Sequence, residues 1–421
     1  MDQEVFVYVD LNGTPHLVGR LWLRVRKRVE SATFRYDDEW LRNPERFALE
    51  PALQVDPAPY HTAAGRSLFG AIGDSAPDRW GRALMMRAEA RRARNAEESP
   101  RTLWESDYLL MVDDETRQGA LRFSFAPDGP FLRQVTDHRT PPLVELPALL
   151  AASEHAYDEA ETEEDLRLLL APGSSLGGAR PKASVRDRDG QLAIAKFPHH
   201  RDQISTVLWE AVANRLAFKA GITTATGRIE IVADRPVFLL RRFDRNGATR
   251  LPFLSAMSML AASDHETRSY LEIADAIQQY GAAPTEDLHE LWRRIVFSIL
   301  ISNTDDHLRN HGFLYAGNQG WRLSPAYDLN PIPVQFRPRI LSTLIDEQSG
   351  EASLDLALNV AEYFRLTQDE AKRTAHEVAT AVTQWKKEAI RLGVATQELD
   401  TVATAFEHSE LEKGRRLARP K

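Results

Sequence analysis

Residues 302–311 gather carboxylates, carboxamides, two imidazoles and a guanidinium into ten consecutive positions. Burying such a cluster is costly and a protein surface does not require one, so we interpret it as a candidate site rather than a solvated loop. Asn310 follows Asp305 by five positions, which is the spacing of Asp and Asn in the catalytic loop of protein kinases. In that arrangement Asp305 accepts a hydrogen bond from an attacking hydroxyl, and the carbonyl oxygen of Asn310 ligates Mg²⁺.

The same stretch supports a second interpretation, a catalytic metal centre. Its two histidines are four positions apart, a common spacing of metal ligands, and two carboxylates precede them. The four candidate ligands are Asp305, Asp306, His307 and His311. This alternative predicts a metal-dependent hydrolase, but it leaves the other candidate elements of the chain without a role.

A loop of small residues at positions 172–185 precedes the cluster. Gly177 and Gly178 lack a Cβ atom, so their backbone amides can approach phosphate oxygens. The loop leads into a predicted hairpin, and Lys196 near its end can place a positive charge beside the α- and β-phosphates of a nucleotide. Glu210, on the next predicted helix, can hold that ammonium group in place.

A second predicted hairpin, at 312–323, follows the cluster, and Asp328 lies in the loop after it. A carboxylate at this point can ligate Mg²⁺ between the phosphates. These candidate elements occur in the order found in two-lobed phosphotransferases. The order is a glycine-rich loop, a lysine on a strand, a glutamate on a helix, the Asp–Asn loop and a second aspartate. The sequence therefore predicts ATP and Mg²⁺ as ligands.

The remaining pattern predicts a strand-rich beginning and a helical end. Apolar runs predict strands at 5–9, 17–23, 32–36, 119–125 and 236–243, and helical periodicity predicts helices at 147–153, 162–170, 205–219, 267–279 and 285–302. Capping-box patterns occur at 102–105 and 367–370. A further helix is expected with Pro77 in its first turn and Ser75 or Asp74 near its cap. It leads to four arginines within 87–94, which either face water or contact phosphate.

The composition is that of a globular protein with 43% hydrophobic residues among 421. The absence of cysteine excludes disulfides and thiolate chemistry and suits a reducing cytoplasm. A net charge of −8 argues against a strongly basic nucleic-acid binder. Apolar runs are too short for a membrane span, and the first residues lack the pattern of a signal peptide. We therefore expect a cytoplasmic protein with no membrane contact.

Several longer motifs resemble the HipA family of serine/threonine kinases, the toxins of toxin–antitoxin systems. The resemblance covers most of the chain, through residues 69–81, 119–123, 175–182, 194–198, 242–245, 303–311 and 326–329. It implies an α+β, two-lobed protein-kinase-like fold with an additional N-terminal β-rich module. The implied division is a HipA-type module at 1–143, a small lobe with the glycine-rich loop at 144–243, and a mainly helical large lobe at 244–421.

The resemblance also implies roles for individual residues. Asp305 would be the catalytic base, and Asn310 and Asp328 would hold Mg²⁺. Ser175, with Ser174 as an adjacent competitor, would be autophosphorylated and so switch the kinase off. The residues implied to contact ATP are Gly177, Gly178, Ala179, Arg180, Lys182, Lys196, Arg241, Arg242, Phe243, His307, Arg309, Asn310 and Asp328.

The implied activity is transfer of the ATP γ-phosphate to a protein serine, with aminoacyl-tRNA synthetases among the family's substrates. The implied partner is a small helix-turn-helix antitoxin, through which the toxin reaches operator DNA. A catalytically weak, nucleotide-binding co-repressor is the alternative. Two departures from related patterns stand out: Asp328 lies in Tyr-Asp-Leu instead of Asp-Phe-Gly, and Arg180 stands where some members have Gln.

Overall fold

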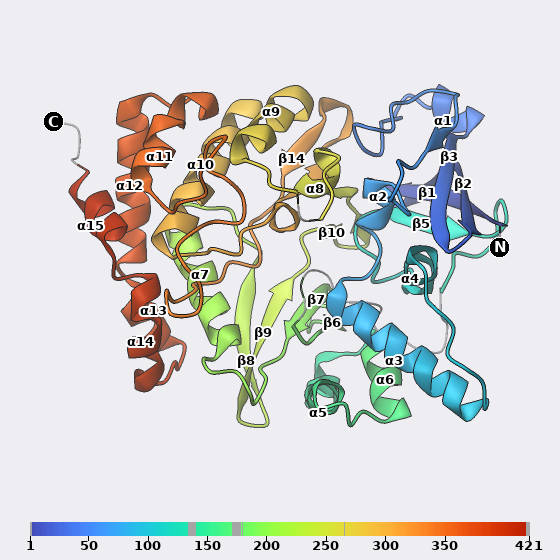
Figure 1. The fold of residues 1–421 in the computed structure, drawn as a ribbon, viewed down its shortest axis with the longest axis horizontal. Helices are drawn as coiled ribbons and strands as arrows, with labels where there is room; N and C mark the ends of the chain where they lie inside the picture. Colours follow the sequence, from blue (N-terminus) through green and yellow to red (C-terminus); the bar gives the residue numbers. More distant parts are fainter. Residues whose placement is uncertain (1, 134–139, 171–177, 179, 265, 418–421) are drawn as a thin grey trace. The chain divides into compact units, whose positions relative to one another are not determined.

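The computed structural model describes residues 2–133, 140–170, 178, 180–264 and 266–417. Internal contacts divide the chain into two compact units, Met1–His199 with Ile231–Leu254, and His200–Glu230 with Ser255–Lys421. Most strands belong to the first unit and most helices to the second (Figure 1). The three-part division expected from the sequence stays a prediction.

The first unit begins with an antiparallel sheet in the order β4-β3-β2-β1-β5. The predicted strands at 5–9, 17–23 and 32–36 are confirmed within β1, β2 and β3, which form because apolar residues recur along them and become buried. The elements of this part are β1 (Asp2–Leu11), β2 (Thr14–Arg26), β3 (Val29–Tyr36), α1 (Asp38–Arg42), β4 (Tyr60–His61), α2 (Gly70–Gly73), α3 (Arg79–Asn95), α4 (Glu105–Met111) and β5 (Leu121–Ser124).

A second sheet of the first unit contains the predicted hairpin after the glycine-rich loop. Strand β7 pairs antiparallel with β6 on one side and with β9 on the other. Helices α3, α5 and α6 share one hydrophobic core with this sheet. Helix α3, which belongs to the first 143 residues, is therefore packed together with the sheet that contains the predicted hairpin. The remaining elements are α5 (Leu146–Tyr157), α6 (Glu163–Leu170), β6 (Lys182–Arg186), β7 (Leu192–Lys196), β8 (Gly227–Val232), β9 (Arg235–Arg241), β10 (Arg245–Asn246), β11 (Thr249–Arg250) and β12 (Phe253–Ser255).

Two helix starts differ from the sequence prediction. Helix α3 is capped by Asp78, whose carboxylate accepts a hydrogen bond from Gly81 N–H at 2.8 Å, so Pro77 precedes the helix. Helix α4 begins at Glu105, and Asp107 accepts from Trp104 N–H at 2.8 Å. At α3 the carboxylate of Asp78 lies nearer the helix than the predicted caps, and at α4 the first free N–H groups, those of Glu105 and Ser106, donate to the carboxylate of Glu30. The predicted caps were therefore wrong by a few residues.

The second unit is built around α10 (Pro284–Leu300), whose Leu291, Trp292 and Ile295 are fully buried. Its sequence forms a helix with a wide apolar stripe, as predicted. The predicted hairpin is confirmed as β13 (Gly312–Tyr315) and β14 (Trp321–Leu323). The other helices are α7 (Thr206–Lys219), α8 (Ala256–Met259), α9 (Tyr270–Tyr280), α11 (Leu354–Asn359), α12 (Gln368–Val382), α13 (Trp385–Arg391), α14 (Thr396–Val402) and α15 (Ser409–Arg416).

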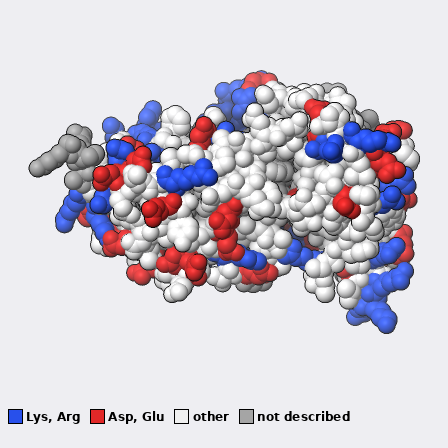
Figure 2. All heavy atoms as spheres, turned by 90° about the horizontal axis from the view of Figure 1, so that it is seen from above, with Lys and Arg blue, Asp and Glu red and all other residues white. Residues whose placement is uncertain are grey.

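Both signs of charge are interspersed over the face of the molecule drawn in Figure 2. This agrees with the modest negative net charge of the chain. Among the described residues, no helix combines the length and the apolar character that crossing a bilayer requires.

Candidate active site

The loop at residues 303–311 connects the end of α10 to β13 in the second unit. Ser302, at its start, is fully buried and has a left-handed backbone with φ of 55°. Such a conformation is uncommon for a residue with a Cβ, and here the side chain is fixed by a hydrogen bond from its hydroxyl to Ala405 O at 2.9 Å. The reversal at Ser302 turns the chain from the buried helix into the polar loop.

Asp305 lies on the solvent-facing side of the loop, whereas Asn310 is largely buried. The amide nitrogen of Asn310 donates to the main-chain oxygen of Asp305 at 3.1 Å. Because only the NH₂ group can donate there, Oδ1 of Asn310 is the atom left for a ligand. The Asp305 side chain is 59% exposed and its Oδ1 lies 2.7 Å from Nη1 of Arg337. The loop thus presents one carboxylate and one carboxamide oxygen, the donor types that a proton acceptor and an Mg²⁺ ligand require.

The opposite side of the loop is a buried polar network centred on Asp306. Its Oδ2 accepts hydrogen bonds from the Tyr270 hydroxyl at 2.5 Å and the Ser298 hydroxyl at 3.2 Å. Its Oδ1 lies 3.1 Å from Nε2 of His311. Burial opposes ionisation, but the charge of His311 and these hydrogen bonds hold the pKa of Asp306 below its usual value. Burial and the adjacent carboxylate raise the pKa of Tyr270 well above normal, so this hydroxyl remains a donor.

This network removes the metal-centre alternative for the loop. Asp306 and His311 contact each other in the interior, whereas Asp305 lies on the exposed side beside Arg337. Among the described residues, these side chains and His307 do not bring their ligand atoms within reach of one ion. The interpretation as a catalytic metal site of four such ligands was therefore wrong.

Asp328 lies beside the loop at 303–311, because residues on either side of it in the chain bond to that loop. The Tyr327 hydroxyl donates to Arg309 O at 2.7 Å, and Asn330 N–H donates to Asn303 Oδ1 at 3.2 Å. Asp328 itself has a left-handed backbone with φ of 57°. Contacts on both sides of Asp328 thus hold an uncommon backbone conformation next to the loop, which is frequent at functional sites.

Two further residues of the loop were implied to lie beside a nucleotide. His307 is half-buried, and its Nδ1 atom has no hydrogen-bond partner among the residues that the structure describes. Arg309 is exposed, and its Nη2 lies 3.0 Å from Asp264 Oδ1. An unpaired buried ring nitrogen is a candidate contact for a ligand, because leaving it unpaired is unfavourable.

The other candidate residues for ATP belong to the first unit. Ser174, Ser175, Gly177 and Ala179 lie outside the described residues. Gly178 is exposed with φ of 85°, and Arg180 is exposed. Lys182, at the start of β6, is buried: its Nζ contacts Asp78 Oδ2 at 2.7 Å and Gly178 O at 3.0 Å.

Lys196 lies directly opposite Lys182 in the β6–β7 register, and opposite Phe238 of β9. Directly opposed residues of antiparallel strands point to the same face, where two like charges repel. Asp78 neutralises Lys182 and so reduces this repulsion. The sequence analysis gave Asp78 no function, although it lies within one of the motifs that resemble the family.

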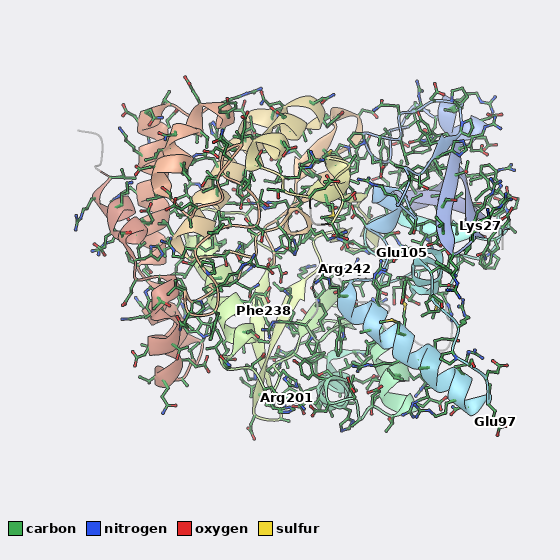
Figure 3. The ribbon with its side chains drawn as sticks, viewed as in Figure 1. Lys27, Glu97, Glu105, Arg201, Phe238 and Arg242 are labelled. Carbon is green, nitrogen blue, oxygen red and sulfur yellow. The ribbon has the colours of Figure 1, made fainter. Side chains whose placement is uncertain are left out.

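Residues 241–243, which the resemblance implies to contact ATP, lie where β9 ends, and Figure 3 labels Phe238 within β9 and Arg242 just after it. Arg241 is exposed and 3.5 Å from Asp189 Oδ2, and Phe243 packs near Phe253 with ring centroids 6.3 Å apart. The guanidinium of Arg242 is fully buried and contacts Asp244 together with the carbonyls of Thr116 and Arg117. Whether these residues also bind ATP stays a prediction.

Asp244 is the centre of that buried cluster. Gly119 N–H donates to its Oδ2 at 2.8 Å, and Arg242 and Arg245 flank it. Burial opposes its ionisation, but the two arginines lower the pKa of Asp244 far below its usual value. The cluster ties the segment after β9 to residues 115–119. Sequence reasoning quoted the motif at 242–245 but missed this function, which only the contacts reveal.

Three of the four arginines within residues 87–94 have structural partners. Arg87 contacts Ala156 O, Arg91 donates to Glu161 O at 2.7 Å, and Arg92 pairs with Glu89 of the same helix. The contacts of Arg87 and Arg91 fasten α3 to the neighbouring α5–α6 region. They favour the surface interpretation of this segment over a phosphate site.

A strand-rich unit followed by a helical unit with this Asp–Asn loop defines a protein of mixed α+β, protein-kinase-like fold. The model of the HipA-like C-terminal domain matches residues 174–385, and that of the HipA N-terminal domain matches residues 8–103. The chain therefore belongs to the HipA family, as the resemblance of its motifs predicted.

Two known proteins similar to this chain are named as putative kinases. A Haemophilus influenzae protein named "Putative kinase" is 29% identical over 136 residues, which make up 29% of this chain and 40% of that protein. A Sinorhizobium fredii protein named "Putative kinase Y4mE" is 26% identical over 193 residues, 40% of this chain and 43% of the relative. The chain thus spans less than half the length of the curated relatives it matches.

A solved structure confirms the fold over nearly the whole chain. It is the complex of HipA, HipB and operator DNA from Shewanella oneidensis MR-1, with a TM-score of 0.67 and 16% identity. The match covers 98% of this chain and 96% of that one. The α+β fold predicted from the sequence is thereby confirmed.

Proposed function

We propose that this chain is an ATP- and Mg²⁺-dependent serine/threonine protein kinase of the HipA type. It transfers the γ-phosphate to a serine of a target protein, with aminoacyl-tRNA synthetases as the candidate class, and to its own Ser175. Membership of the HipA family and the names of two relatives support kinase activity. The serine specificity and the target are inferred from the resemblance of the motifs.

The observation that carries this proposal is the hydrogen bond from the Asn310 amide to the main chain of Asp305. It closes the five-residue interval between the proposed base and the proposed metal ligand. With the loop closed in this way, the Asp305 carboxylate is exposed to solvent. The amide nitrogen of Asn310 is engaged, which leaves its carbonyl oxygen as the atom that would ligate Mg²⁺ in the proposed site.

In the proposed reaction the substrate hydroxyl oxygen forms a bond to the γ-phosphorus as the bond from that phosphorus to ADP breaks. The electron pair of the broken bond leaves with ADP, and the hydroxyl proton passes to Asp305. The oxygens of Asn310 and Asp328 fit Mg²⁺, which would neutralise phosphate charge when bound. Lys196 and Arg180 would contact the phosphates.

The direct test is incubation of the purified chain with ATP and MgCl₂, followed by mass spectrometry of its peptides. We expect phosphate on Ser175 in the wild-type chain and none in Asp305→Ala. Phosphate on Ser174 alone would reassign the modified residue but retain the activity. Nucleotide binding without transfer to any serine, in the chain or in added synthetases, contradicts the kinase and favours the co-repressor alternative.

We further propose that the chain acts as a growth-inhibiting toxin with a small helix-turn-helix antitoxin as its partner. Support comes from the solved complex of the similar fold, which contains HipA, HipB and operator DNA. We expect operator DNA to be retarded on a gel by the antitoxin, and retarded further when this chain is added. Retardation by this chain alone would contradict the indirect contact with DNA.

A further inference from the structure

Arg337 contacts the proposed catalytic base on the solvent-facing side of the loop. Its Nη1 lies 2.7 Å from Asp305 Oδ1, and its Nη2 donates to Ser342 Oγ at 3.0 Å. Ser342 Oγ in turn donates to Thr304 O at 3.1 Å. Both nitrogens of the guanidinium are therefore held in place. One contacts the carboxylate of Asp305, and the other contacts the hydroxyl of Ser342, which is itself bonded to Thr304, the residue before Asp305.

We call residues 331–343 the strap; they lie between β14 and α11 (Figure 1). The strap is fastened to the loop and to the end of α10 without Arg337. Its main fastenings are Ile332 N–H to Ser302 O at 3.2 Å, Ser342 N–H to Thr304 O at 3.1 Å, Thr343 Oγ1 to Asp306 O at 2.7 Å and Arg339 Nη2 to Ile299 O at 2.8 Å. The contact between Arg337 and Asp305 is therefore not required to hold the strap in place.

Two arginines of the strap differ in what they contact. Arg339 is largely buried, and it bonds the Ser302 hydroxyl and the last turn of α10. Arg337 keeps 40% of its side chain exposed, and Asp305 keeps 59%. An ion pair this exposed contributes only about 0–1 kcal/mol to stability. Arg339 thus serves the fold, while Arg337 has little effect on it.

The Asp305 carboxylate is left with one engaged oxygen and one open oxygen. Oδ1 contacts Arg337, and within the described part of the chain nothing hydrogen-bonds to Oδ2. A general base works when an unoccupied oxygen points at the proton it removes. Fixing Oδ1 prevents the carboxylate from rotating and so fixes the direction of Oδ2.

We infer that Arg337 is a positioning residue for phosphate transfer, which orients Asp305 so that Oδ2 meets the substrate hydroxyl. The inference rests on the proposed function, because it assigns a partner to the base of that reaction. Misplacing a reacting group by about 1 Å costs roughly 100-fold in rate. Substitution of Arg337 should therefore lower kcat and leave ATP binding unchanged.

The test compares steady-state transfer by Arg337→Gln, Arg337→Lys and the wild-type chain. We expect Arg337→Gln to lower kcat by about 10- to 100-fold, with the KM for ATP within about twofold of wild type. Arg337→Lys should recover part of kcat, since an ammonium can contact Asp305 but cannot reproduce the planar fork that also holds Ser342. Arg415→Gln, which breaks an exposed pair with Glu412 on α15, is the matched control and should be unchanged.

The variant pair Asp305→Ala and Asp305→Ala/Arg337→Gln separates positioning from a merely structural role. If Arg337 acts only through Asp305, the second substitution has no further effect on residual transfer. Wild-type kcat in Arg337→Gln would overturn the inference, as would a changed KM for ATP in place of a changed kcat. Absence of transfer in the wild-type chain is a distinct result: it would overturn the proposed function itself, and this inference with it.

Discussion

Asp305 and Asp306 are neighbours in the chain but lie on opposite sides of the loop at 303–311. Asp305 is 59% exposed and contacts a single arginine, whereas the Asp306 side chain is 5% exposed and is surrounded by Tyr270, Ser298 and His311. A buried carboxylate persists only when its charge and lone pairs are satisfied, while an exposed one is solvated by water. The buried side thus fixes the loop, and the exposed side is left open for reaction.

The first unit contains a cluster that resembles the buried side of the loop. Asp244 there is as well satisfied as Asp306, with Gly119, Arg242 and Arg245 around it. It also lies next to a predicted nucleotide-contacting segment. In each unit, a buried aspartate holds the backbone beside residues that are expected to act on ATP.

The largest effect should come from the exposed side. Asp305→Ala should lower phosphate transfer by about 1,000-fold, within the range expected for loss of a general base. Its thermal unfolding should match the wild type, because its exposed ion pair contributes little to stability. Transfer assays and differential scanning calorimetry check both halves. Loss of folding would instead make Asp305 a structural residue and remove the contrast between the two sides.

On the buried side, Asp306→Ala should have the opposite profile. Removing this carboxylate leaves the Tyr270 hydroxyl and His311 buried without their partner, a loss of about 3–5 kcal/mol of unfolding free energy. Urea denaturation followed by circular dichroism measures it. The matched control is Asp355→Ala, because Asp355 is 69% exposed in the same unit and, among the residues that the structure describes, is paired with Lys413 alone. Equal stability of the two variants would show that the network around Asp306 is dispensable.

Acid should lower the free energy of unfolding through His408 before it affects solvated carboxylates. His408 Nε2 contacts Leu300 O, where α10 ends, and its Nδ1 accepts from Leu411 N–H, so the ring fits only when neutral. Burial lowers the pKa of His408 to about 4 from 6.5. The unfolded chain therefore binds the proton first, and stability that is complete above pH 6.5 falls as the pH drops towards 4.

The difference of pKa corresponds to about 3 kcal/mol of unfolding free energy. The lowered pKa of Asp306 adds a further loss at lower pH, because its stabilisation disappears only as the pH falls below the usual pKa of an aspartate. Denaturation curves between pH 7 and 4 should show a smaller decline for His408→Gln than for the wild type. Parallel curves for the two proteins would exclude His408 as the cause.

A smaller loss of stability should result from removing one hydrogen bond to Asp306 than from removing the carboxylate itself. Tyr270→Phe removes the hydroxyl that donates to Asp306 but leaves Ser298 and His311 in place. We expect a loss of about 1.5–3 kcal/mol, as for a hydrogen bond to a charged group. Tyr363→Phe, at a tyrosine that is 56% exposed, is the control. A destabilisation equal to that of Asp306→Ala would mean that the tyrosine, rather than the carboxylate, organises the network.

Much of the local structure could be predicted because its signals lie within a few residues. Apolar runs predicted the strands now seen as β1 to β3, and a helical stripe predicted α10. The capping box at Thr367 is confirmed by its bonds with Glu370. Caps failed where two candidates compete at close range, as at Asp78, since the choice depends on which carboxylate the packed helix brings to its free N–H groups.

The sequence alone could not predict that Asp305 is exposed and that Asp306 is buried. The two differ because Tyr270, 36 positions from Asp306, lies beneath one side of the loop, and Arg337, 32 positions from Asp305, lies on the other. Likewise the partner of Lys182 is Asp78, 104 positions away. No window of sequence contains such pairs, and a motif search detects only one member of each.

What the sequence determined by itself is the family, the α+β fold and the position of the loop with its Asp–Asn spacing. These depend on residue order over short distances, where periodicity, turns and motif spacing act directly. The tertiary structure alone decided which aspartate is solvated and which is buried, and which distant side chains contact each of them. The physical reason is that a buried charge is stable only with partners, and distant segments supply those partners after the chain has packed.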